Sequence, residues 1–93
     1  MDNSDTTVHS AFYDLFPEDE AAELEIRAAL LRGLQHWVAE SGDTQVRIAE
    51  TLGVDQARVP DIKRGEINRF SLDRLVKLAS RAGLHPRLEL DAA

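Results

Sequence analysis

The 93-residue chain is predicted to form an all-α domain of four to five helices, followed by a short C-terminal β-strand. Apolar residues recur every three or four positions in several segments, as they do on the buried face of a helix. Glycines suited to ending helices follow these segments at Gly42, Gly53, Gly65 and Gly83. A chain of this length is predicted to be one small domain with one hydrophobic core.

The first helix is expected over about residues 17–41. Pro17 suits the first helical position, and the three acids that follow it favour the positive end of the helix dipole. The apolar residues of this segment cover a broad stripe, so the helix should pack on its own domain along one edge and on something else along another. Residues 1–11 are polar and aperiodic and predict a disordered tail, which leaves the domain itself over residues 12–84.

Residues 44–65 have the pattern of two short helices joined by a tight turn. Thr44 can cap the first of them, which ends at Gly53, and Asp55 is a candidate cap for the second. A DNA-binding helix-turn-helix has this layout, and its second helix enters the major groove. This stretch is therefore the main functional signal in the sequence.

A helical wheel divides the second helix of the motif into an inner and an outer face. At about 100° per residue, Val59 and Ile62 point inward. Glutamine can pair with an adenine edge or a phosphate, arginine with a guanine or a phosphate, and alanine can touch a thymine methyl group. The residues expected on the outer face are Gln56, Ala57, Pro60, Asp61 and Arg64.

Pro60 falls inside the expected recognition helix. If that helix began at Gln56, the proline would remove a backbone hydrogen bond at a cost of about 3 kcal/mol. A start about two residues later would place Pro60 in the first turn, where no bond is lost. The later start, which shortens or bends the helix, is the favoured prediction. Both arrangements are compatible with weak or altered reading of an operator.

A last helix is expected over about residues 71–82, with Ser71 as its cap and Gly83 after its end. Residues 84–91 then alternate between apolar and polar types, which predicts a short strand, with strand and tail together over residues 85–93. Because a lone strand is only marginally stable, it is expected to pair with a second copy or with a partner.

The formal net charge of -6 is unevenly distributed along the chain. Residues 1–43 carry ten acids and two bases, a charge of -8, whereas residues 44–93 carry nine bases and seven acids, a charge of +2. The acidic half is either a solubilising tail or a surface for a basic protein partner. The mildly basic half suits contact with phosphates.

Composition also disfavours several classes of protein. The chain has no cysteine, and its three histidines share no ligand spacing, so neither disulfides nor a metal site is expected. It contains no nucleophile motif or glycine-rich phosphate loop, which argues against an enzyme or a bound cofactor. With no apolar run of membrane-spanning length and no signal-like N-terminus, a cytoplasmic protein is expected.

The motif also carries a resemblance to a known family. The segment resembles the Cro and phage-repressor (XRE-type) helix-turn-helix family and, more narrowly, the HigA-like antitoxins that pair with RelE/HigB-type toxins. The likeness covers about residues 12–91, and the family usually has a serine or similar residue where Pro60 stands. It rests on Arg58-Val59-Pro60-Asp61-Ile62-Lys63-Arg64-Gly65, followed by Arg69-Phe70-Ser71-Leu72-Asp73-Arg74-Leu75.

This resemblance implies a lambda-repressor-like domain that dimerises on a palindromic operator, represses its own promoter and masks a toxin endoribonuclease. It places Gln45 at a phosphate-contacting position and puts Asn68 and Arg69 near the operator backbone. The expected DNA-binding residues are Thr44, Gln45, Gln56, Ala57, Arg58, Asp61, Arg64, Asn68 and Arg69.

Three interpretations of function stay open at this point. The first is a homodimeric antitoxin and autorepressor, with operator DNA and a basic RelE/HigB-like toxin as its partners. The second is a free-standing XRE-family transcriptional repressor without a toxin. The third is a protein-interaction module that no longer binds DNA, because of Pro60 and the acidic charge.

Overall fold

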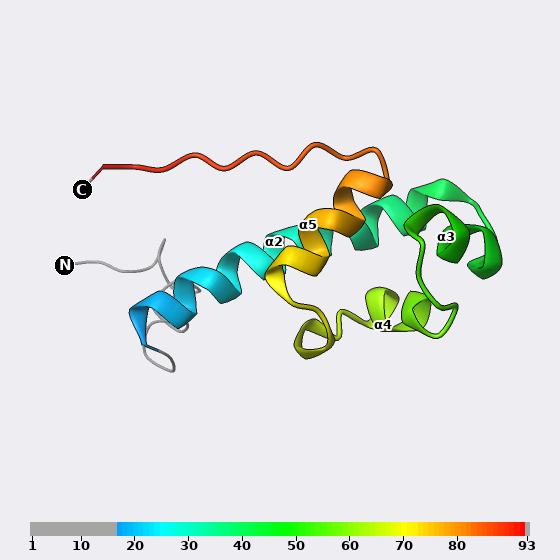
Figure 1. The fold of residues 1–93 in the computed structure, drawn as a ribbon, viewed down its shortest axis with the longest axis horizontal. Helices are drawn as coiled ribbons and strands as arrows, with labels where there is room; N and C mark the ends of the chain where they lie inside the picture. The colour runs from blue at the N-terminus through cyan, green and yellow to red at the C-terminus, as the bar shows by residue number, and fades with distance from the viewer. Residues whose placement is uncertain (1–16, 93) are drawn as a thin grey trace.

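The computed structural model describes residues 17–92, and the predicted tail over residues 1–11 lies outside this range. The described residues form four α-helices and one short 3-10 helix (Figure 1). This arrangement agrees with the predicted all-α class. In chain order the elements are α2 (Glu18–Ser41), α3 (Gln45–Leu52), α4 (Arg58–Arg64), η2 (Ile67–Arg69) and α5 (Leu72–Arg81).

Helix α2 is the element on which the others pack. Its 24 residues give it a length of about 36 Å. Its C-terminal half buries Leu31, Leu34 and Val38 in the core, mainly against α4 and α5, whereas its first turns extend beyond the other helices (Figure 1). No helix within residues 17–92 is long and apolar enough to cross a bilayer.

Helices α3 and α4 are held at an angle by a capped turn. The Thr44 hydroxyl accepts a hydrogen bond from the backbone N–H of Arg47 (3.2 Å), which begins α3. Gly53 ends it with a φ of 67°, a left-handed conformation that glycine adopts without steric cost. Its backbone N–H donates to the carbonyls of Ala49 and Glu50, so the chain reverses directly after the helix.

The hydrophobic core lies where these helices meet. Val59 and Ile62 of α4 are both fully buried, which confirms the inner face predicted from the wheel. They pack with side chains from the other elements, and Trp37 covers the core as a partly buried residue. The remaining core residues are Leu31, Leu34, Val38, Ile48, Ala49, Leu52, Phe70, Leu75 and Leu78.

The prediction of a C-terminal strand is wrong for the chain on its own. Residues 84–92 run as an extended trace alongside α2 (Figure 1), with no strand partner among the described residues. The last backbone hydrogen bond recorded in this part of the chain joins the N–H of Leu84 to the carbonyl of Ala79 (2.9 Å). Alternation favours an extended backbone, but a strand also needs a neighbouring strand, and the described elements are all helical.

Candidate nucleic-acid interface

The candidate recognition helix α4 begins at Arg58, two residues later than Gln56, and this confirms the favoured prediction. Pro60 is therefore its third residue. The first four N–H groups of a helix have no partner within it, so the missing N–H of proline removes no hydrogen bond here. The consequence is a recognition helix of only seven residues, short but not broken.

Pro60→Ser is expected to lower the free energy of unfolding by no more than about 1 kcal/mol, because serine restores no helical bond and only loosens the unfolded chain. Urea unfolding of both proteins measures this difference. A serine variant that is more stable by about 3 kcal/mol would show instead that the proline breaks a helical hydrogen bond.

Gln56 and Ala57 lie in the turn before α4 rather than in the helix. The Asp55 carboxylate accepts from the backbone N–H of Ala57 (3.0 Å), so it caps this turn. The side-chain amide of Gln45 donates to the carbonyl of Gln56 (3.3 Å). This bond joins the start of α3 to the turn before α4. Gln45 and Gln56 therefore lie close together, and both are exposed.

Asp61 does not face outward as the wheel predicted, since only 5% of the residue is exposed. Its Oδ2 accepts from Arg58 Nη1 (2.9 Å), its Oδ1 accepts from Arg64 Nη2 (3.0 Å), and Arg69 Nε lies 3.8 Å from Oδ1. The wheel fails here because it represents one helix alone. The arginine from η2 and the two on α4 close over the carboxylate and cover it.

These three arginines, Arg58, Arg64 and Arg69, form what we call the arginine cluster. Their side chains are 44, 60 and 59% exposed, so each is anchored to Asp61 and still reaches solvent. A guanidinium has five N–H donors and uses only one or two of them on a carboxylate. The cluster can therefore contact phosphates while Asp61 holds it in place. The Glu66 carboxylate lies 3.4 Å from Arg64 Nε. Together with Asp61, it partly offsets the positive charge of the arginine cluster.

Two side chains of α2 position this interface, and neither was predicted from the sequence. Arg27 Nη1 donates to the carbonyls of Ile67 and Phe70 (both 3.3 Å), which fixes the loop that carries Asn68 and Arg69. Gln35 Nε2 donates to the carbonyl of Lys63 at the end of α4 (3.2 Å). Both contacts join residues at least 28 positions apart, so no local pattern could have revealed them.

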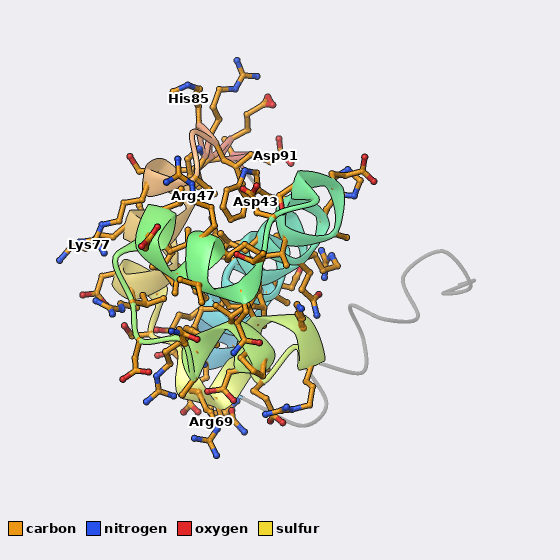
Figure 2. The ribbon with its side chains drawn as sticks, turned by 90° about the vertical axis from the view of Figure 1, so that its right-hand side faces the viewer. Asp43, Arg47, Arg69, Lys77, His85 and Asp91 are labelled. Atoms are coloured by element: carbon orange, nitrogen blue, oxygen red, sulfur yellow. The ribbon has the colours of Figure 1, made fainter. Side chains whose placement is uncertain are left out.

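The structure thus brings the predicted residues together on the α4 side of the domain, with two exceptions. Asp61 lies beneath the surface, and the Thr44 hydroxyl is occupied by the cap of α3. Asn68 is exposed in η2. Figure 2 shows Arg69 at the lower end of the view and His85 at the upper end, with Arg47 of α3 between them. No cluster that could hold a metal ion occurs within residues 17–92.

Two short helices joined by a tight turn, with arginines at the surface of the second, define the helix-turn-helix class of DNA-binding protein. A family model described as a helix-turn-helix domain matches residues 11–91, and the chain belongs to this family. The match supports a protein of the XRE/Cro kind and indicates a DNA-binding regulator, a class that is typically not enzymatic. None of the curated proteins matches the chain.

Proposed function

We propose that the protein is the antitoxin of a type II toxin-antitoxin pair. It binds operator DNA as a homodimer, represses its own promoter and neutralises a basic RelE/HigB-like toxin in the cytoplasm. The observation that carries this proposal is the separation of two charged surfaces. The arginine cluster lies on the α4 side, and an exposed acidic turn begins α2 at the far end of the molecule (Figure 1).

The DNA-binding half of the proposal is supported by the geometry of the interface. Arg64 and Arg69 are exposed, anchored and close to each other through Asp61, so they suit operator phosphates. Gln56 and Ala57 in the exposed turn are the candidates for base contacts. Asp61 acts in this proposal by positioning the arginines, because its carboxylate already accepts hydrogen bonds from two of them.

The toxin-binding half is supported by charge and by distance. Glu18, Asp19 and Glu20 occupy the first turn of α2 and are all exposed. RelE/HigB-like toxins are basic, so opposite charge would favour association with this turn. The first turn of α2 lies at one end of the molecule, away from α4 and η2, which carry the arginine cluster (Figure 1). A toxin bound at this turn would therefore leave the arginine cluster accessible to an operator.

The experiment that tests the proposal is binding to the DNA upstream of the gene, with and without the co-expressed neighbouring protein. We expect specific binding at low to moderate salt, and affinity that falls as salt rises because phosphate contacts release counterions. Reversing the charges with Glu18→Lys, Asp19→Lys and Glu20→Lys together should abolish capture of the neighbour and leave DNA binding in place.

The outcomes separate the competing interpretations. If the protein binds the promoter but does not capture the co-expressed neighbouring protein, it is a free-standing repressor, and the antitoxin role is contradicted. Absence of promoter binding, alone or with the neighbour, would leave a protein-interaction module. That third interpretation is favoured by one observation, since Asp61 and Glu66 offset two of the three charges of the arginine cluster.

A further inference from the structure

The C-terminal segment, residues 84–92, is anchored at Leu84, whose N–H donates to the carbonyl of Ala79 and whose side chain packs against the core. Beyond Leu84, its backbone has no hydrogen-bond partner among the described residues. Leu88 is 64% exposed and Leu90 is 85% exposed, the two highest values among the large apolar residues recorded as exposed. An extended segment with free N–H and C=O groups is a ready template for pairing with another strand. The alternating pattern of the segment suits that pairing, which its own domain does not supply.

An apolar groove lies beside this segment and extends the unpartnered surface. It has a volume of about 500 Å³ and runs between α2, α5 and the C-terminal segment. Ile26 and Leu30 line it from α2, Val76 from α5, and Pro86, Arg87 and Leu88 from the segment. A second strand laid along residues 84–92 would bring further apolar side chains to the edge of this groove.

The segment is complementary to itself in one antiparallel register. If two copies pair with Leu88 opposite Leu88, then Arg87 of each copy lies opposite Glu89 of the other, and His85 lies opposite Asp91. The intervening pairs are apolar, Pro86 with Leu90 and Leu84 with Ala92. Opposite charges at facing positions stabilise a pair of strands, and like charges destabilise it. A parallel pairing in register would instead place Arg87 against Arg87 and Glu89 against Glu89.

Pro86 also agrees with this register. Facing residues of an antiparallel pair alternate between hydrogen-bonded and non-hydrogen-bonded positions. Proline has no N–H to donate, so it fits only a non-hydrogen-bonded position. Leu88, two residues later, then occupies the same type of position, where facing Cα atoms are about 4.5 Å apart.

From these observations we propose that residues 84–92 of two copies of this chain pair as antiparallel strands centred on Leu88 and form the dimer interface. The occupant of the groove edge is then Leu90 of the second copy, which lies opposite Pro86. The inference rests on the proposed homodimer and names the surface and register that build it. It also accounts for a strand pattern that a single copy leaves unused.

Cysteine cross-linking tests the register directly, because the native chain has no cysteine. In the full-length protein, Leu88→Cys is expected to give a covalent dimer on mild oxidation, since a Cα separation of about 4.5 Å suits a disulfide. Leu90→Cys is the matched control. Its two cysteines would lie four positions apart along the strands, about 13 Å, too far to be bridged. Equal cross-linking of both variants, or none at position 88, would overturn the register.

A charge exchange tests the same pairing between molecules. Arg87→Glu and Glu89→Arg should each weaken the homodimer by about fivefold, because each places two like-charge pairs across the interface. An equimolar mixture of the two variants should form a heterodimer of native affinity, since every facing pair is then of opposite charge. A pairing of charges within one chain would gain nothing from mixing, so failure of the mixture to recover would contradict the proposal.

Sedimentation of the native chain, run beside these experiments, separates this inference from the proposed function. A native dimer that does not cross-link at position 88 overturns the interface alone. A native monomer overturns both the interface and the homodimer, whereas DNA binding is measured independently on the promoter fragment. A 1:1 complex with the neighbouring protein that protects position 88 while the free chain is monomeric would assign the segment to that partner and overturn the proposal.

Discussion

Arg64→Ala is expected to weaken operator binding by about 10- to 100-fold, because a dimer loses the contact twice and each charged contact contributes about 1 kcal/mol or more. The loss should extend to unrelated DNA sequences if the guanidinium contacts phosphate. The slope of log affinity against log salt concentration should then fall by about 1 for each half-site. Mobility-shift titrations of the promoter fragment and a scrambled fragment, over a salt series, measure both effects.

Arg47→Ala is the matched control for this experiment. It removes the same charge from an exposed side chain whose ion-pair partner is Glu50, at 3.6 Å. Figure 2 places Arg47 in the upper half of the view, away from Arg69 at its lower end. If both alanine variants lose affinity equally, the effect comes from overall charge, and a specific role for Arg64 is contradicted.

Leu34→Ala should have the largest effect on stability. Leu34 is fully buried in the core, where α2 meets the other helices. Truncating such a leucine leaves a cavity and costs about 2–5 kcal/mol. Because small domains are stable by only about 5–15 kcal/mol, Tm should fall by roughly 10–30 °C. Thermal unfolding followed by circular dichroism measures the change.

Val46→Ala serves as the comparison, since Val46 lies on α3 with 48% of its surface exposed. Its removal should change the stability by less than about 1 kcal/mol. Near-equal Tm values for Leu34→Ala and the native protein would mean that α2 does not pack on the core as described.

The site was predicted in outline, and its details depend on contacts distant in sequence. Local sequence patterns predicted the turn at Gly53, the burial of Val59 and Ile62, and the later start of α4. The environment of Asp61 was not, because it is covered by Arg69 as well as by the arginines of its own helix. A helical wheel cannot show what a following loop brings over a face.

The helices, the turn and the inward-facing Val59 and Ile62 follow from local sequence patterns, because caps, glycines and apolar spacing act within a few residues. The alternation of apolar and polar residues in the C-terminal segment is also a property of the sequence. Whether the segment pairs as a strand depends on a neighbouring strand, which the described residues of one chain do not provide. The burial of Asp61 beneath three arginines, and the hydrogen bonds from Arg27 to the loop that follows α4, depend on the packing of the helices. Those outcomes depend on residues that become neighbours only when the helices pack.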